Sequence, residues 1–172
     1  WNAVQQVNID RAAAEGKNSF GSQIKALHGD VVIDLICFTP ESAAQLAEAL
    51  TGTVQHFIHC GTMWVHGHSE QVPTTETQPR KPFGEYGINK ANIEAYLLSL
   101  HRENNFPVTI LHPGHITGPG WHPINPAGHL DPEIFIRLSN GEAITLPNIG
   151  METLHHVHAD DVAQAFEKAI MH

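Results

Sequence analysis

The strongest constraint on the fold of this chain is a regular alternation of short apolar runs and helical segments. The run at 31–38 is apolar at nearly every position, shorter strand-like runs follow at 54–60 and 107–111, and segments with a helical pattern separate them. A run of this kind is typical of a strand buried on both faces of a parallel sheet. The alternation therefore predicts an α/β fold, a doubly wound parallel sheet with helices on both faces.

The boundaries of the other elements follow from local signals. The residues Thr39-Pro40-Glu41 place a hydroxyl, a proline and an acid at the start of one helix. Helices are expected over 22–27, 40–50, 83–104, 132–139 and 160–170, and further strands over 4–9, 143–146 and 154–157. Ligands of such sheets bind beyond the carboxyl ends of the strands. The residues that follow the three central runs, at 37–38, 61–62 and 112–115, are therefore expected along one edge.

Composition narrows the class of partner. The 172 residues are 41% hydrophobic and 16% charged, which is typical of a single globular domain. The formal charge of −9 disfavours nucleic acid and anionic membranes as partners. The sequence has no apolar segment long enough to span a bilayer and no signal peptide. Its two cysteines lie in apolar runs, so we expect reduced thiols and a cytoplasmic location.

One pair of polar residues shares a face of the longest predicted helix. Tyr86 and Lys90 are four residues apart, and Ile93 and Leu97 continue the same stripe. An ammonium group beside a phenol lowers the pKa of the phenol, which can then act as a general acid or base. Taken alone, the spacing is so common that a tyrosine and a lysine whose stems pack on an ordinary helix explain it better.

Several motifs in register decide between these two interpretations. They are Thr62-x-x-Val65-His66-Gly67, Pro79-x-x-Pro82-x-x-x-Tyr86-Gly87-x-x-Lys90, His112-Pro113-Gly114-x-x-x-Gly118-Pro119-Gly120 and His158-Ala159-Asp160-Asp161-Val162-Ala163. Together they resemble the motifs of the extended short-chain dehydrogenase/reductases, also called NAD-dependent epimerase/dehydratases. The resemblance covers almost the whole chain. His66 stands where this family usually has tyrosine and His112 where it usually has arginine, so an atypical branch is expected.

The resemblance implies a role for particular residues. It assigns substrate orientation to Thr62, general acid/base catalysis to Tyr86, and both pKa tuning and ribose binding to Lys90. The cofactor-binding residues that it implies are Asp10, Arg11, Phe38, Lys90 and His115. The substrate-binding residues that it implies are Trp121, Asn125 and His129. For these last three, a proline-rich loop pinned by one buried tryptophan is an equal alternative. Despite fourteen histidines, no metal site is expected, because no complete ligand set has convincing spacing.

At the level of the molecule, the resemblance implies a partial Rossmann-like NAD(P)-binding domain over residues 1–172, to which 115–155 contribute a substrate-binding region. The expected activity is that of an NAD(P)-dependent oxidoreductase or epimerase/dehydratase. It would act on a hydroxyl or keto group of a small polar metabolite such as a sugar derivative, with NAD or NADP as cofactor. The alternative is a non-catalytic dinucleotide- or RNA-associated binding protein on the same fold.

The resemblance also predicts an unpaired edge of the sheet. The first two strands of the family and their glycine-rich turn are expected to precede Trp1. In the strand order 3-2-1-4-5-6, the first strand would lie beside the run at 31–36. Without it, this apolar edge is expected to seek a partner. We therefore expect a homo-oligomer, or association with a separately supplied N-terminal segment.

Overall fold

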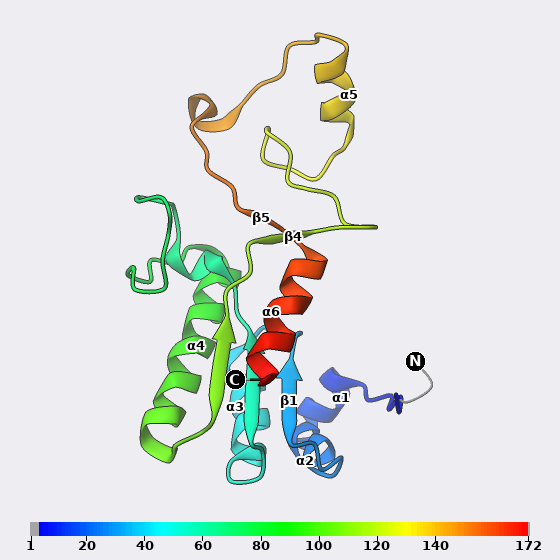
Figure 1. Ribbon diagram of the computed structural model, residues 1–172, viewed down its shortest axis with the longest axis vertical. Coiled ribbons are helices and arrows are strands. Elements are labelled where there is room, and N and C mark those ends of the chain that lie inside the picture. Colours follow the sequence, from blue (N-terminus) through cyan, green and yellow to red (C-terminus); the bar gives the residue numbers. More distant parts are fainter. Residues whose placement is uncertain (1–3, 172) are drawn as a thin grey trace.

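The computed structural model describes residues 4–171, and a three-stranded parallel sheet lies at its centre (Figure 1). The strands are β1 (Val31–Asp34), β2 (His56–Cys60) and β3 (Val108–Leu111), in the order β1-β2-β3. All three predicted central runs thus form strands, and both pairings are parallel. The predicted class of fold, a parallel α/β fold, is confirmed.

Helices cover both faces of this sheet. Two of them, α3 (Pro40–Leu50) and α4 (Gly84–Asn104), pack behind it in Figure 1, and α6 (Ala159–Met171) crosses in front. The short helices α1 (Arg11–Gly16) and α2 (Phe20–Lys25) lie beside α3. The main core lies between the sheet and the helices behind it, and its largest members include Leu46, Leu50, Phe57, Ile93, Leu97 and Phe106.

The two long helices begin and end where the local signals indicate. The hydroxyl of Thr39 accepts a hydrogen bond from the Ser42 backbone N–H at 3.3 Å and so caps α3. Helix α4 ends at Asn105, whose φ of 53° is left-handed, a conformation that asparagine tolerates better than most residues. Along α4, Lys90, Ile93 and Leu97 are buried against the sheet, as the stripe predicts.

A second, two-stranded parallel sheet carries the part of the chain for which substrate binding was predicted. Its strands are β4 (His115–Thr117) and β5 (His156–His158), with Ile116 paired to Val157. Between them, residues 118–155 extend away from the main sheet (Figure 1). This segment, here named the arm, contains α5 (Glu133–Ser139) and the 3-10 turn η2 (Pro147–Gly150). Another 3-10 turn, η1 (Met63–His66), follows β2.

Several predicted elements are wrong. Residues 4–9 and 143–146 form no strand, because no other strand of the described chain lies beside them. The polar, alanine-rich stretch after Asp10 is helix α1, and strand β4 was not expected. The run at 31–38 is a strand only as far as Asp34. It is not buried on both faces, since β1 is an edge strand and both Ile36 and Phe38 are more than half exposed.

No helix within residues 4–171 is long and apolar enough to cross a membrane.

Candidate active site

Three elements bring four of the predicted site residues together at the carboxyl edge of the sheet. Helix α4 carries Tyr86 and Lys90, the segment after β1 carries Phe38, and the segment after β2 carries Thr62. The Lys90 Nζ atom lies 5.1 Å from the centroid of the Phe38 ring and 6.0 Å from that of Tyr86. The centroids of the Phe38 and Tyr86 rings are 6.5 Å apart. We name Phe38, Thr62, Tyr86 and Lys90 the proton-transfer cluster.

Lys90 and Thr62 are both fixed by backbone groups that follow β2. The Lys90 ammonium donates a hydrogen bond to the Cys60 carbonyl oxygen at 2.8 Å and is almost completely buried. The Thr62 hydroxyl oxygen accepts from the Trp64 backbone N–H at 3.3 Å at the start of η1. Since that bond uses only the oxygen, the hydroxyl hydrogen of Thr62 is available to a substrate.

Burial dominates the electrostatics of the cluster. Burial raises the pKa of Tyr86, and the neighbouring Thr62 hydroxyl opposes part of that rise. Burial also lowers the pKa of Lys90. The predicted lowering of the Tyr86 pKa by Lys90 is not found in this structure: burial raises that pKa, and the Lys90 ammonium is directed at the Cys60 carbonyl oxygen. Near neutral pH Tyr86 is a phenol, ready to donate its proton.

The sequence analysis missed a buried ionic network next to this cluster. Glu94 lies one helical turn beyond Lys90 and is buried. The Nε atom of Arg80 donates to its carboxylate at 3.1 Å, and the Nε2 atom of His112 lies 3.1 Å from the other carboxylate oxygen. Burial alone would raise the pKa of Glu94, but His112 and Arg80 together lower it to about 2. The four-residue spacing from Tyr86 through Lys90 to Glu94 was the available signal.

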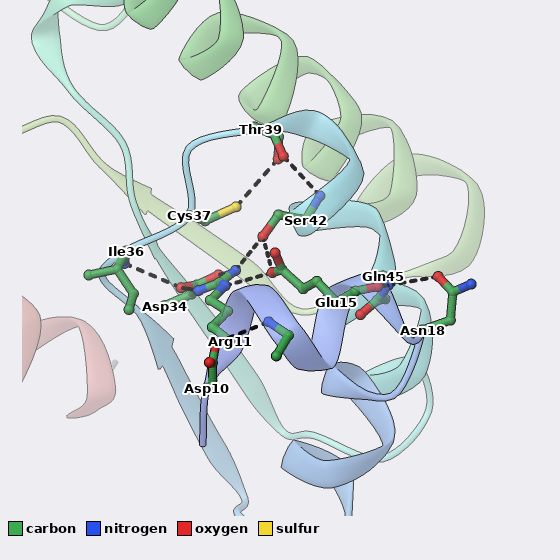
Figure 2. Close-up of polar contacts among 11 residues, drawn as sticks. Asp10, Arg11, Glu15, Asn18, Asp34, Ile36, Cys37, Thr39, Ser42 and Gln45 are labelled. Carbon is green, nitrogen blue, oxygen red and sulfur yellow. Dashed lines mark hydrogen bonds and ion pairs between the residues drawn. The ribbon is translucent and has the colours of Figure 1, made fainter. Parts of the chain in front are cut away.

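Two of the predicted cofactor-binding residues, Asp10 and Arg11, have structural contacts in this structure (Figure 2). Asp10 caps α1 by accepting from the Ala13 backbone N–H at 3.0 Å. The Arg11 guanidinium donates to both Asp34 carboxylate oxygens, at 2.6 and 3.1 Å, and to the Ser42 hydroxyl at 2.7 Å. Within the described chain, neither residue forms a hydrogen bond or ion pair with Tyr86 or Lys90.

The predicted substrate-side residues lie in the arm and do not all meet. The Asn125 side chain is fully buried, and its Nδ2 atom donates to the Asp131 carbonyl oxygen and approaches His129 Nδ1, both at 2.8 Å. Its oxygen accepts from the Ala127 backbone N–H at 2.9 Å. Trp121 is 68% exposed. The loop is thus pinned by Asn125, and the alternative of a buried tryptophan is wrong.

His115 starts β4 and faces a cavity of about 340 Å³ between the segment after β2 and the arm. The segment after β2 and the turn before α4 contribute Trp64, His66, His68 and Phe83 to the wall, and the end of the arm contributes 151–155. Met63 follows Thr62 in the sequence and Phe83 lies three residues before Tyr86, but none of the four residues of the proton-transfer cluster is itself in the wall of this cavity. Within residues 4–171, no three His, Cys, Asp or Glu side chains are grouped as metal ligands.

Comparison with known families and structures agrees with this geometry. Residues 40–172 match the NAD dependent epimerase/dehydratase family, and the chain belongs to that family. The dTDP-D-glucose 4,6-dehydratase of Bos taurus is 27% identical over 113 residues, which cover 66% of this chain and 31% of that protein.

Two solved structures share the fold. One is dTDP-glucose 4,6-dehydratase from Bacillus anthracis in complex with NAD, with a TM-score of 0.68 and 16% identity over 86% of this chain and 51% of that one. The other is UDP-glucose 4-epimerase from Thermotoga maritima with UDP-glucose, with a TM-score of 0.66 and 24% identity over 88% of this chain and 55% of that one. The chain thus spans about a third to a half of the length of these proteins.

Proposed function

We propose that this chain provides the proton-transfer site of an NAD(P)-dependent epimerase, dehydratase or oxidoreductase that acts on a sugar derivative. The observation that carries the proposal is the convergence of Thr62, Tyr86 and Lys90 beyond the carboxyl ends of parallel strands. The family of the chain adds support, as do two of the proteins it resembles, a dTDP-D-glucose 4,6-dehydratase and a UDP-glucose 4-epimerase. Within the domain, residues 115–155 would form part of the substrate side.

Each residue of the site has its own role in proton transfer or in binding. A bound nicotinamide cofactor supplies the hydride transfer at carbon. When a keto group is reduced, Tyr86 gives its phenolic proton to the substrate oxygen; in the opposite direction, the phenolate takes the hydroxyl proton. The Thr62 hydroxyl donates to the same substrate oxygen. Lys90 has two ammonium hydrogens beyond the one bound to Cys60, and these are suited to ribose hydroxyl groups.

Some of the predicted cofactor-binding side chains are suited to contact a dinucleotide, and one is not. Phe38 is 53% exposed and Tyr86 is 47% exposed, so both rings have open faces beside the Lys90 ammonium. Asp10 retains a free carboxylate oxygen at the surface and could accept from an adenine amino group. Arg11 fits less well, because Asp34, Ser42 and Glu15 already occupy its guanidinium group. We therefore retain Phe38, Lys90, His115 and Asp10 as proposed cofactor contacts and expect Arg11 to act structurally.

Removal of the phenolic oxygen of Tyr86 tests the proposal. Tyr86→Phe should lower turnover of a dTDP- or UDP-linked hexose, or of an unmodified sugar substrate, by about a hundredfold or more, because general acid/base catalysis is typically worth that much. Affinity for the nicotinamide cofactor, measured by calorimetry, should stay unchanged. In Lys90→Met that affinity should fall. Unaltered turnover in Tyr86→Phe would refute the assigned role.

We also propose that β1 pairs with a further strand, from a second copy of the chain or from a separately supplied N-terminal segment. Support comes from its position at the edge of the sheet and from exposed apolar side chains at Ile33, Leu35 and Ile36.

A further inference from the structure

One loop of the arm, residues 124–131, is held by two histidine rings that accept hydrogen bonds. The Ile124 backbone N–H donates to the Nε2 atom of His156 on β5 at 3.1 Å. The Asp131 backbone N–H donates to the Nδ1 atom of His129, inside the loop, at 3.3 Å. A backbone N–H only donates, so each of these ring nitrogens has a lone pair and no hydrogen. The loop in this conformation therefore requires both rings to be uncharged.

The buried Asn125 amide shows independently that His129 Nδ1 is an acceptor. The amide oxygen accepts from the Ala127 backbone N–H at 2.9 Å, and Nδ2 donates to the Asp131 carbonyl oxygen at 2.8 Å. These two contacts fix the orientation of the amide, because the reverse orientation would oppose two donors and two acceptors. The second hydrogen of Nδ2 is thus directed at His129 Nδ1, 2.8 Å away.

Protonation of the two rings is incompatible with these contacts. An imidazolium carries hydrogen on both nitrogens and accepts no hydrogen bond. The N–H groups of Ile124, Asn125 and Asp131 would then face other N–H groups. The Asn125 side chain is 0% exposed, so its donor would be left without a partner, which is costly. If the loop leaves its place, the freed donors and the charged rings can bind water instead.

The titratable groups around His156 cannot restore its lost contact. The ring of His115 on β4 is in T-shaped contact with that of His156, with centroids 5.5 Å apart, so two imidazolium rings would repel each other there. The other titratable groups on β5, at the end of the arm and at the start of α6 are Glu152, His155, His158, Asp160 and Asp161. The carboxylates among them attract an imidazolium, but the bond from Ile124 needs a lone pair on the ring.

The charged groups beside His129 suit a ring that has turned out of the loop. Asp131 and Glu133 lie at the start of α5, where the Asp131 carboxylate accepts from the Glu133 backbone N–H at 3.0 Å. Both carboxylates attract an imidazolium once it has left Asn125. The basic residue of α5, Arg137, is paired with Glu142 at 3.2 Å.

We propose that protonation of His129 and His156 releases the 124–131 loop, so that this part of the arm opens in mildly acidic solution. Histidine is the side chain that ordinarily changes its charge between about pH 5 and 8. The inference goes beyond the proposed function and does not depend on it.

Hydrogen exchange of the loop amides, measured by mass spectrometry at about pH 7.5 and about pH 5.5, tests the proposal. Each rate is divided by the intrinsic exchange rate at the same pH, which gives a protection factor. Protection of 124–131 should fall by about tenfold or more at the lower pH, because two or three hydrogen bonds are lost and each is worth a factor of about 2 to 12. The amides of β2 should remain more protected at both pH values, since the opening is local.

The double variant His129→Asn/His156→Gln separates these two rings from the other histidines. Asparagine has an oxygen at the δ position and glutamine one at the ε position, so both side chains can accept the same bonds and neither titrates. Its loop protection should change by less than about twofold between the two pH values. The control His122→Gln removes an exposed histidine whose ring forms no hydrogen bond within residues 4–171, and it should behave like the wild type.

Either of two results would overturn the proposal. One is a protection factor of the wild-type loop that is the same at both pH values, which needs no variant to be seen. The other is an equal loss of protection in the double variant and in the wild type, since the response would then come from groups other than His129 and His156.

Discussion

His59 is the residue with the least satisfied polar side chain in the described part of the chain. It is 1% exposed on β2, and neither ring nitrogen has a hydrogen-bond partner among residues 4–171. Burial, reinforced by the charge of Lys90, lowers its pKa to about 4. The proton-transfer cluster does not use this side chain, so its main consequence is for stability.

Stability should therefore depend on pH through His59. The unfolded chain, with a histidine pKa near ~6.5, binds a proton more readily than the folded chain between about pH 6.5 and about 4. The free energy of unfolding contributed by this residue is thus highest above about pH 6.5 and is lost as the pH falls toward about 4, by on the order of 3 kcal/mol. In His59→Leu, urea unfolding at several pH values should show a shallower decline across this window.

A second histidine serves as control for this experiment. His28 is exposed and has a φ of 55°, which asparagine tolerates, so His28→Asn should keep the pH dependence of the wild type. The Glu94 carboxyl, whose pKa is lowered to about 2, loses its stabilising effect at still lower pH and does not interfere. Equal slopes in His59→Leu and the wild type would contradict the prediction.

At the level of elements, Arg11 connects α1 to β1, α2 and α3, and buried Ala14 and the Glu15 contacts with α3 add to this attachment. Six residues are too few for an isolated helix to be stable in water, so its attachment depends on tertiary contacts. Arg11 joins α1 to β1 through Asp34 and to α3 through Ser42 (Figure 2). Its guanidinium also lies 4.6 Å from the centroid of the Phe20 ring in α2.

Loss of this arginine should be strongly destabilising. Arg11→Ala leaves the Asp34 carboxylate buried without a charged partner, with only the Ile36 backbone N–H still donating to it at 3.4 Å, and loss of one partner of a buried pair typically costs about 3–5 kcal/mol in the free energy of unfolding. Urea unfolding should show the loss, and the double variant Arg11→Ala/Asp34→Ala should recover part of it. The control Arg102→Ala changes an exposed residue in the last turn of α4 and should shift stability by less than ~0.5 kcal/mol. A loss in Arg11→Ala no larger than in this control would argue against a structural role for Arg11.

Elements that are determined by residues within their own segment were predicted well from the sequence, and elements that depend on distant contacts were not. Helices α3 and α4 were placed to within a residue because caps and the apolar stripe lie within each segment. The strands expected at 4–9 and 143–146 failed because a strand needs a neighbour, and an apolar run does not reveal one. Helix α1 was not predicted, because it has no apolar periodicity and its attachment depends on the contacts of Arg11.

For the whole molecule, the position of the site could be predicted from the topology. Which polar side chains already have all their hydrogen-bond partners could not be predicted. The carboxyl ends of parallel strands meet at one edge, so Phe38 and Thr62 could be expected together, and the resemblance to the family added Tyr86 and Lys90. The Asn125 amide forms its hydrogen bonds inside the arm, and the Arg11 guanidinium forms its hydrogen bonds beside Asp34. These contacts are distant in sequence or irregular, so no sequence pattern displays them.

The open edge at β1 leads to a prediction about assembly. If a second copy pairs there, sedimentation of the wild type should give a dimer, and Ile33→Lys should shift it toward the monomer, because a charge on an edge strand opposes pairing. Ile149→Lys, at a fully exposed position of the arm, should not change the mass. A wild type that stays monomeric at all concentrations would point to the N-terminal segment as partner.

The arm leaves the domain at Thr117 and returns at His156, and these positions belong to two adjacent, directly paired strands (Figure 1). Its two ends are therefore held together whatever lies between them, and the entropy of closing a loop rises only slowly with its length. The length and sequence of the arm can therefore change during evolution without a shift of Thr62, Tyr86 or Lys90. Under the proposed function, changes in this one segment would alter the substrate while the residues proposed for proton transfer stay in place.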